Sequence, residues 1–108
     1  MTTKIDHDPA RRRFAAQVER GEAVLDYELA DGGDTLDLTR TFVSDELRGE
    51  GLAGRVVQHA LDWARHHDKG VIATCPYVER WVERHPEYGD LLARPATTAS
   101  GVPGAAGG

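Results

Sequence analysis

The chain has 108 residues, enough for one domain with a modest core. Thirteen Lys and Arg side chains stand against 18 Asp and Glu, so the formal net charge is −5. Because proteins that bind nucleic acid generally carry a basic surface, this balance argues against such a function.

Three further properties of the sequence narrow the class of protein. No apolar run approaches the roughly 20 residues that span a bilayer. The charged N-terminus lacks the apolar segment of a secretory signal. Cys75 is the single cysteine, which excludes an intramolecular disulfide and a cysteine-based zinc site. We therefore expect a cytoplasmic protein that acts on neither nucleic acid nor membranes.

The two ends of the chain differ in composition from the middle. Residues 1–12 are polar and contain Pro9, so we expect a flexible N-terminal arm. Residues 94–108 are rich in Gly and Ala and offer little apolar surface to bury, so a disordered tail is predicted there. The folded domain is therefore expected at residues 13–93.

In the N-terminal half, apolar and polar side chains alternate with a period of two, which is typical of half-buried strands. Strands are predicted at residues 14–18, 23–29 and 36–43, and the short turns between them imply an antiparallel meander. Arg40 breaks the alternation, because by parity it should share an apolar face with Phe42. Three interpretations stay open: the side chain reaches into a polar cleft, a β-bulge shifts the register, or the guanidinium extends into water at the sheet edge.

From Gly51 the apolar period changes to 3.6, which predicts an amphipathic helix over residues 51–67. Its apolar stripe consists of two rows of side chains: Leu52, Val56, Ala60 and Ala64, and beside them Ala53, Val57 and Leu61. The apolar run at residues 71–75 suits a strand buried on both faces, and residues 77–84 have the spacing of a second helix. The order β-β-β-α-β-α contains one βαβ crossover, whose two strands should be parallel. The sequence therefore predicts an α+β (mixed α/β) fold, in which an antiparallel meander is followed by this crossover and a second helix.

The segment that opens the first helix is rich in glycine: Arg48-Gly49-Glu50-Gly51-Leu52-Ala53-Gly54. A helix N-terminus presents unpaired N–H groups and the positive end of the helix dipole, and glycines leave these donors unshielded. The loop is therefore a candidate site for phosphate oxygens, with added charge from Arg48. The alternative is that the glycines serve only a tight turn.

Gly49-x-Gly51-x-x-Gly54 matches the letters of a dinucleotide-binding fingerprint, but its context does not. Residues 44–48 separate the glycines from the strand, no acidic residue follows at the end of the next strand, and the chain is too short for further βαβ units. The loop is not a P-loop either, because no Lys-Ser/Thr pair follows the last glycine.

Arg48-x-x-Gly51-x-Ala53 instead resembles the Arg/Gln-x-x-Gly-x-Gly/Ala signature of the GNAT superfamily of acyl-CoA-dependent N-acyltransferases. Two later segments, Thr74-Cys75-Pro76-Tyr77-Val78 and Arg84-His85-Pro86-Glu87-Tyr88, are similar to small single-domain GNAT-type acetyltransferases of the YidJ type. The resemblance covers about residues 13–92. It implies a truncated GNAT-like fold, acetyl-CoA as the bound cofactor, and transfer of the acetyl group to an amine that the sequence does not identify.

The resemblance also implies where acetyl-CoA binds. The loop amides would hold the pyrophosphate, and a backbone N–H of the preceding strand would donate to the thioester carbonyl, whose oxygen gains negative charge during the reaction. The cofactor-binding residues predicted in this way are Thr41, Phe42, Val43, Arg48, Gly49, Glu50, Gly51, Leu52, Ala53, Gly54 and Cys75.

Three side chains are candidate catalytic residues. Cys75 ends the last predicted strand and precedes a helix, a position that lowers the pKa of a thiol and suits it as nucleophile or proton donor; the alternative is a small buried core residue. His85 and Tyr88 follow the second helix and could transfer protons, or could form a cluster that caps and packs that helix. No metal site is predicted. The family that the chain resembles often has His where this chain has Arg40, so a module that binds CoA or a protein partner without turnover is the alternative function.

Overall fold

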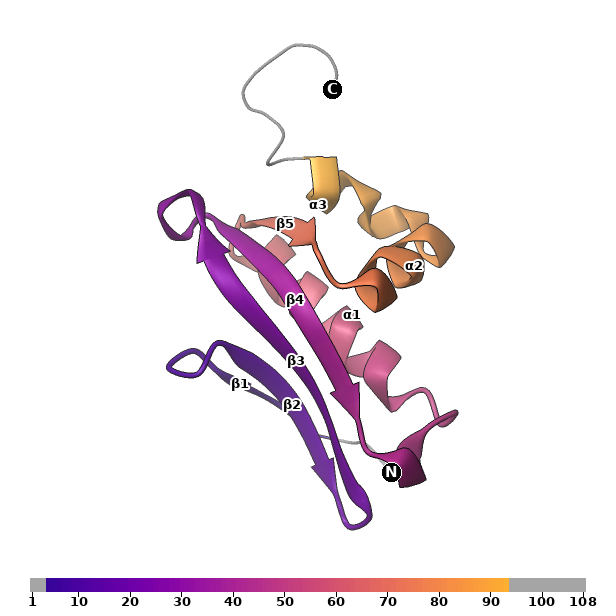
Figure 1. Ribbon diagram of the computed structural model, residues 1–108. Coiled ribbons are helices and arrows are strands. Elements are labelled where there is room, and N and C mark those ends of the chain that lie inside the picture. Colours follow the sequence, from indigo (N-terminus) through magenta and orange to yellow (C-terminus); the bar gives the residue numbers. More distant parts are fainter. Residues whose placement is uncertain (1–3, 94–108) are drawn as a thin grey trace.

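The computed structural model describes residues 4–93, and the predicted tail at residues 94–108 lies outside the described residues (Figure 1). One mixed sheet contains the strands β1 (Ile5–Asp8), β2 (Arg13–Val18), β3 (Gly21–Ala30), β4 (Thr35–Val43) and β5 (Gly70–Ala73), in that spatial order. The α-helices are α1 (Leu52–His66), α2 (Pro76–Arg84) and α3 (Gly89–Ala93). Strands β1 to β4 are antiparallel, and β5 is parallel to β4. The predicted α+β fold with one βαβ crossover is confirmed.

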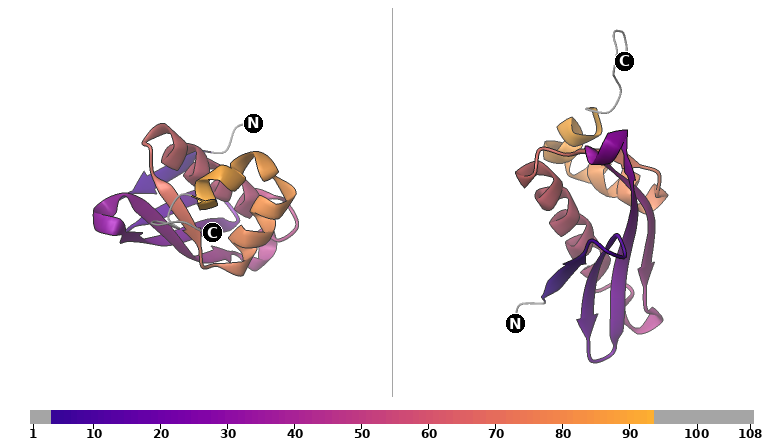
Figure 2. Two further views of the ribbon diagram at one scale, coloured as in Figure 1. Left: turned by 90° about the horizontal axis from the view of Figure 1, so that it is seen from above. Right: turned by 90° about the vertical axis from the view of Figure 1, so that its left-hand side faces the viewer.

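Helix α1 covers one face of the sheet, as the right-hand view of Figure 2 shows. Every residue of its predicted apolar stripe is buried. All of these side chains except Ala53 belong to one core cluster together with Phe14, Leu25 and Leu38 of the sheet. Burial of a side chain the size of Leu or Val contributes about 1.5–3 kcal/mol, so this layer accounts for the attachment of α1 to the sheet. Within residues 4–93, none of the helices has the length and apolar character needed to span a bilayer.

The N-terminal segment is a strand, so the prediction of a flexible arm was wrong for residues 5–8. Strand β1 pairs with β2 from Ile5–Ala16 to Asp8–Arg13. The ring of His7 stacks on Phe14, with ring centroids 4.1 Å apart, and its Nε2 lies 2.6 Å from the hydroxyl oxygen of Tyr27. A mostly polar composition does not reveal this strand, which is held in place by backbone pairing, by the His7 ring and by Ile5 packed against the core.

His7 should make the stability of the domain depend on pH. Burial and the nearby His59 lower the pKa of His7, Asp8 opposes this, and His67 lowers it further, so its pKa lies below the ordinary value. The unfolded chain therefore takes up this proton first as the pH falls, and stability is lost on acidification through the ordinary pKa of histidine. Replacing His7 with Phe keeps a ring on Phe14 but removes the titration.

Urea unfolding at about pH 7.5 and about pH 5.5, on either side of the ordinary histidine pKa, measures this effect. The wild type should lose more stability between the two pH values than His7→Phe does. Equal losses in the two proteins would show that His7 does not carry the dependence.

A β-bulge interrupts the pairing of β4 with β3. Asp26 lies opposite Arg40 but the next residue of β3, Tyr27, lies opposite Leu38, so Thr39 has no counterpart. The extra residue reverses the alternation of the strand beyond it. This confirms the bulge interpretation of Arg40, whose Nε lies 3.9 Å from Asp26 Oδ2 on the open face of the sheet.

The same bulge explains why the placement of Phe42 on the apolar face was wrong. Phe42 is 47 % exposed, whereas Thr41 and Val43 are partly buried. Val43 packs against the core. Beyond Thr39, β4 therefore directs its odd-numbered residues toward the helices.

Strand β5 lies at the edge of the sheet, so the prediction of a strand buried on both faces was wrong. Val71 is buried, but Ile72 and Ala73 are only half-buried. The pairing with β4 ends at Leu38–Ala73, and one further bond joins Cys75 N–H to the carbonyl of Leu38 at 2.9 Å. The chain then turns into α2, which lies beside the second half of β4 (Figure 1). As a result, residues 39–43 of β4 have no strand on this side within the described part of the chain.

Candidate functional site

The glycine loop (residues 48–54) lies beyond the C-terminal end of β4, after a short 3-10 turn at Asp45–Leu47. Gly49 and Gly51 have φ angles of 84° and 80°, in the left-handed region that glycine adopts without a steric penalty. Gly51 directly precedes α1, and no side chain among the described residues caps the helix there. The first N–H groups of α1 are therefore left available at this end, as an anion site requires.

Gly54 has a different role from the other two glycines. A Cβ built on Gly54 would lie 3.0 Å from Nε1 of Trp81 and 3.6 Å from the hydroxyl oxygen of Tyr77. The absent side chain thus allows α2 to pack closely against the first turn of α1. The sequence pattern alone could not separate this packing role from the turn-forming role of Gly49 and Gly51.

A cavity of about 470 Å³ opens between the end of β4, the glycine loop and the start of α2. It is lined by Val43, Leu47, Arg48, Gly49, Gly51, Leu52, Ala53 and Tyr77. Six of these eight were predicted to bind the cofactor. Leu47 was not, although an apolar residue in the polar stretch before the loop is a signal for it.

The remaining predicted cofactor residues lie around this cavity without lining it. The Phe42 side chain is on the solvent side of β4, and the Glu50 carboxylate pairs with Arg20. For Phe42, the predicted role belongs to the backbone and does not depend on the side chain. Arg48 is exposed and lies 3.3 Å from an oxygen of Asp45, so its guanidinium is at the rim.

The structure brings Cys75 and Thr41 together, although they are 34 positions apart in the sequence. Cys75 precedes α2 and is 6 % exposed, and its Sγ lies 3.3 Å from Thr41 Oγ1. Burial raises the pKa of the Cys75 thiol, but hydrogen bonds from the Thr41 side chain and from backbone N–H groups of Val78, Tyr77 and Thr41 outweigh it, so the pKa is lowered on balance. A thiol with a lowered pKa loses its proton at a lower pH than an ordinary cysteine does.

The glycine loop, the strand before it and the Cys75 turn all fall within one family match. Residues 13–91 match the family model of the GCN5-related N-acetyltransferases. The chain belongs to this family. As a GCN5-related N-acetyltransferase domain it is similar to the proteins named NATD1 of Xenopus tropicalis and Homo sapiens, each 34 % identical over 85 residues. The aligned part covers 77 % of this chain, 77 % of the frog protein and 74 % of the human protein.

The fold of this GCN5-related domain is also similar to a solved structure. The solution structure of a GCN5-like protein from Staphylococcus aureus superimposes with a TM-score of 0.65, covering 82 % of this chain and 86 % of that chain. At 24 % sequence identity, the likeness concerns the fold alone.

In this GCN5-related domain, His85 and Tyr88 belong to a cluster around Trp81 rather than to the lining of the cavity. The Tyr88 hydroxyl donates to Asp62 Oδ1 at 2.7 Å, and this hydrogen bond together with burial raises the pKa of Tyr88. His85 stacks on Trp81, with ring centroids 3.8 Å apart, and its Nδ1 lies 2.8 Å from the Trp81 carbonyl oxygen. These contacts support the packing alternative for both residues.

Replacing Tyr88 with Phe tests that alternative. The variant loses the hydrogen bond to Asp62 but keeps the ring against Trp81, so the free energy of unfolding should fall by about 1 kcal/mol. Urea unfolding measures this change, and calorimetry should show unchanged binding of CoA. If Tyr88 has instead the catalytic role predicted from the sequence, turnover by the folded variant will fall even though CoA still binds.

Proposed function

We propose that this domain binds acetyl-CoA in the cavity at the end of β4 and transfers the acetyl group to an amine. The observation that carries the proposal is the glycine loop, where Gly49 and Gly51 leave the uncapped start of α1 open at the C-terminal end of a strand. The segments around Cys75 and Tyr88 further support a small single-domain protein of the YidJ type. We place it in the cytoplasm, because a single cysteine fits a reducing compartment. The acceptor amine is unidentified.

The bound acetyl-CoA would extend from the glycine loop to Cys75 along the open edge of β4. Strand β5 pairs only with residues 35–38, so the backbone of Thr41 to Val43 faces the cavity side without a strand partner among the described residues. An extended amide-containing arm can hydrogen-bond to such an edge. We place the thioester beside Thr41 to Val43, where the backbone N–H of Val43 can donate to the carbonyl oxygen as it gains negative charge. The N–H of Thr41 is engaged by the sulfur of Cys75.

Cys75 is the proposed proton donor. Acetyl-CoA supplies an activated thioester. The transfer forms a bond between the acceptor nitrogen and the acyl carbon and breaks the carbon–sulfur bond, so a proton must reach the departing sulfur. The Cys75 thiol gives this proton, and the proton that the nitrogen loses returns to Cys75 through solvent. The contact with Thr41 orients the thiol toward the strand that holds the carbonyl.

A second candidate function is a module that binds CoA, or a protein partner, without turnover. Arg40, at a position where the family often has His, lies on the open face of the sheet and pairs with Asp26. Among the described residues, the cavity lining contains no carboxylate and no imidazole that could accept a proton from the amine. These two observations favour the module.

Calorimetric titration with CoA and with acetyl-CoA tests the proposal. We expect binding with a dissociation constant between about 1 μM and 1 mM, the usual range for enzyme substrates. A screen of amine acceptors, with release of free thiol as the readout, then separates the enzyme from the module. Absence of binding at millimolar ligand would overturn the enzyme and the CoA-binding module together.

A further inference from the structure

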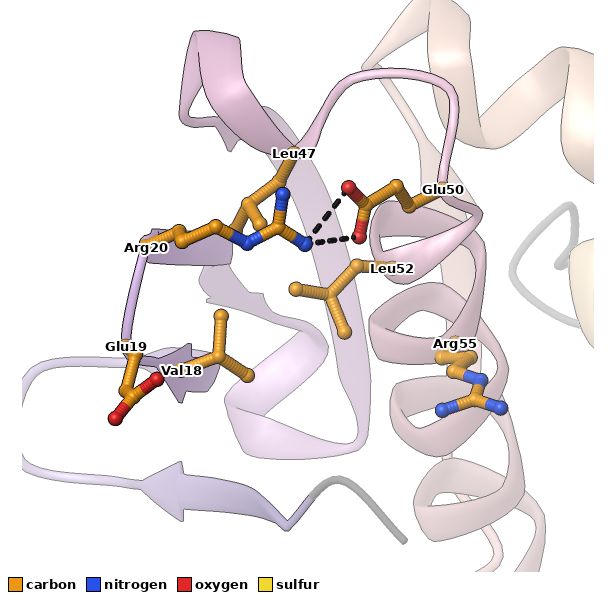
Figure 3. A pocket seen from close by; sticks show the side chains of 7 residues that line it. All are labelled: Val18, Glu19, Arg20, Leu47, Glu50, Leu52 and Arg55. Carbon is orange, nitrogen blue, oxygen red and sulfur yellow. Dashed lines mark hydrogen bonds and ion pairs between the residues drawn. The ribbon is translucent and has the colours of Figure 1, made fainter. Parts of the chain in front are cut away.

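A second cavity, of about 540 Å³, lies on the other side of the glycine loop (Figure 3). Its lining combines the turn between β2 and β3 with the loop and the start of α1: Val18, Glu19, Arg20, Leu47, Glu50, Leu52 and Arg55. Leu47 and Leu52 line both cavities, so the end of the 3-10 turn and the glycine loop separate the two cavities.

Arg20 and Glu50 face one another across this second cavity (Figure 3). Arg20 Nη2 donates to both carboxylate oxygens of Glu50, at 2.9 and 2.8 Å, although the residues are 30 positions apart. Glu50 stands between the two left-handed glycines of the loop, yet its side chain lines the second cavity and not the first. Arg20 therefore holds the carboxylate on the side away from the proposed phosphate site.

The charges near the glycine loop indicate how the Arg20–Glu50 pair affects anion binding. Residues 44–55 contain three carboxylates, at Asp45, Glu46 and Glu50, against two arginines. One of these arginines, Arg48, is already paired with Asp45. A Glu50 carboxylate that was free to turn toward a pyrophosphate would repel it, because like charges a few ångströms apart oppose one another even when partly screened.

The pair has little to contribute to folding. The side chains of Arg20 and Glu50 are 58 % and 45 % exposed, and exposed ion pairs add little to stability. Its effect should therefore appear in ligand binding and not in the melting temperature.

We propose that Arg20 is a positioning residue for the phosphates of the CoA ligand, which acts by neutralising Glu50 and holding it away from the glycine loop. The inference rests on the proposed acetyl-CoA site. The alternative is that the Arg20–Glu50 pair only ties the turn to the loop. In that case, replacing either residue would weaken CoA binding. If Arg20 instead shields the Glu50 charge, replacing Arg20 weakens CoA binding only while that charge is present.

The test compares the dissociation constant of CoA for four proteins by calorimetry at low ionic strength: the wild type, Arg20→Ala, Glu50→Gln and the double variant. Arg20→Ala should bind about fivefold more weakly, because one unshielded charge then acts on two phosphate charges. Glu50→Gln should bind at least as tightly as the wild type. The double variant should return to within about twofold of the wild type, since distant screened charges change affinity little.

A matched control and a second readout sharpen this comparison. Arg11→Ala removes the same charge from another exposed pair, with Asp8, and should bind CoA like the wild type. The loss of CoA affinity in Arg20→Ala should be smaller in about 0.5 M salt, where the Debye length is only a few ångströms. The melting temperatures of the variants and the wild type should be equal.

The outcomes separate this inference from the proposed function. If the wild type binds CoA but Arg20→Ala binds equally well, or the double variant stays as weak as Arg20→Ala, the inference is overturned and the proposed function stands. If the wild type shows no binding, the proposed function fails, and the inference fails with it.

Discussion

Replacing Gly51 with Asp should abolish the binding of CoA to this domain. The substitution places a carboxylate at the start of α1, where the proposed pyrophosphate would accept hydrogen bonds from the loop. Repulsion between this carboxylate and two phosphate charges at close range should weaken binding by about 100-fold or more. Calorimetry with CoA measures the loss.

The φ angle of 80° at Gly51 requires a control for backbone strain. Gly51→Asn is that control, because Asn has the size of Asp, is neutral and tolerates the left-handed region. The fold should survive in both variants, since Asp and Asn are favourable residues at the start of a helix. If the Asp variant binds CoA within a few-fold of the Asn variant, charge at this position does not matter and the phosphate assignment is wrong.

Replacing Cys75 with Ala should lower acetyl transfer by about 10²- to 10⁴-fold, the usual contribution of a positioned proton donor, while CoA still binds. The readout is release of free thiol with the best acceptor from the screen. Cys75→Ser serves as the matched variant, because it keeps the size and the contact with Thr41 but has a far less acidic proton. Unchanged turnover in the Ala variant would remove Cys75 from the mechanism.

Two measurements distinguish the possible roles of the thiol. A nucleophilic Cys75 would carry an acetyl group after incubation with acetyl-CoA alone, which mass spectrometry detects, whereas a proton donor stays unmodified. In Thr41→Val the side-chain hydrogen bond that lowers the pKa of Cys75 is missing, so the thiol should titrate at higher pH than in the wild type. Thiolate absorbance against pH measures this shift without any acceptor.

Much of the fold can be predicted because its signals are local. The stripe of α1 follows from the spacing of seven apolar residues, and strands β2 to β4 follow from alternation along each strand. The glycine loop is recognisable for the same reason, since Arg48, Gly51 and Ala53 lie within one short segment. Each of these features depends on residues that lie close together in the sequence.

The features that escape sequence analysis depend on residues far apart in the chain. Strand β1 is held by contacts of His7 with Phe14 and Tyr27, and composition does not reveal them. The pairing of Arg20 with Glu50 depends on how a hairpin turn approaches the loop. Sequence position suggests Cys75 as a site residue, but its partner emerges only from the folded sheet.

The bulge at Thr39 decides which side chains of β4 reach the candidate site. If the same residues paired with β3 without a bulge, Thr41 would turn to solvent and Phe42 would point at the thiol of Cys75, because successive residues of a strand project to opposite faces. Deletion of Thr39 would instead give a regular ladder in which Leu38 and Thr41 are two positions apart, so the hydroxyl would stay on the side of the sulfur. In this domain the register of a strand, as much as the identity of its residues, determines the chemistry available to the site.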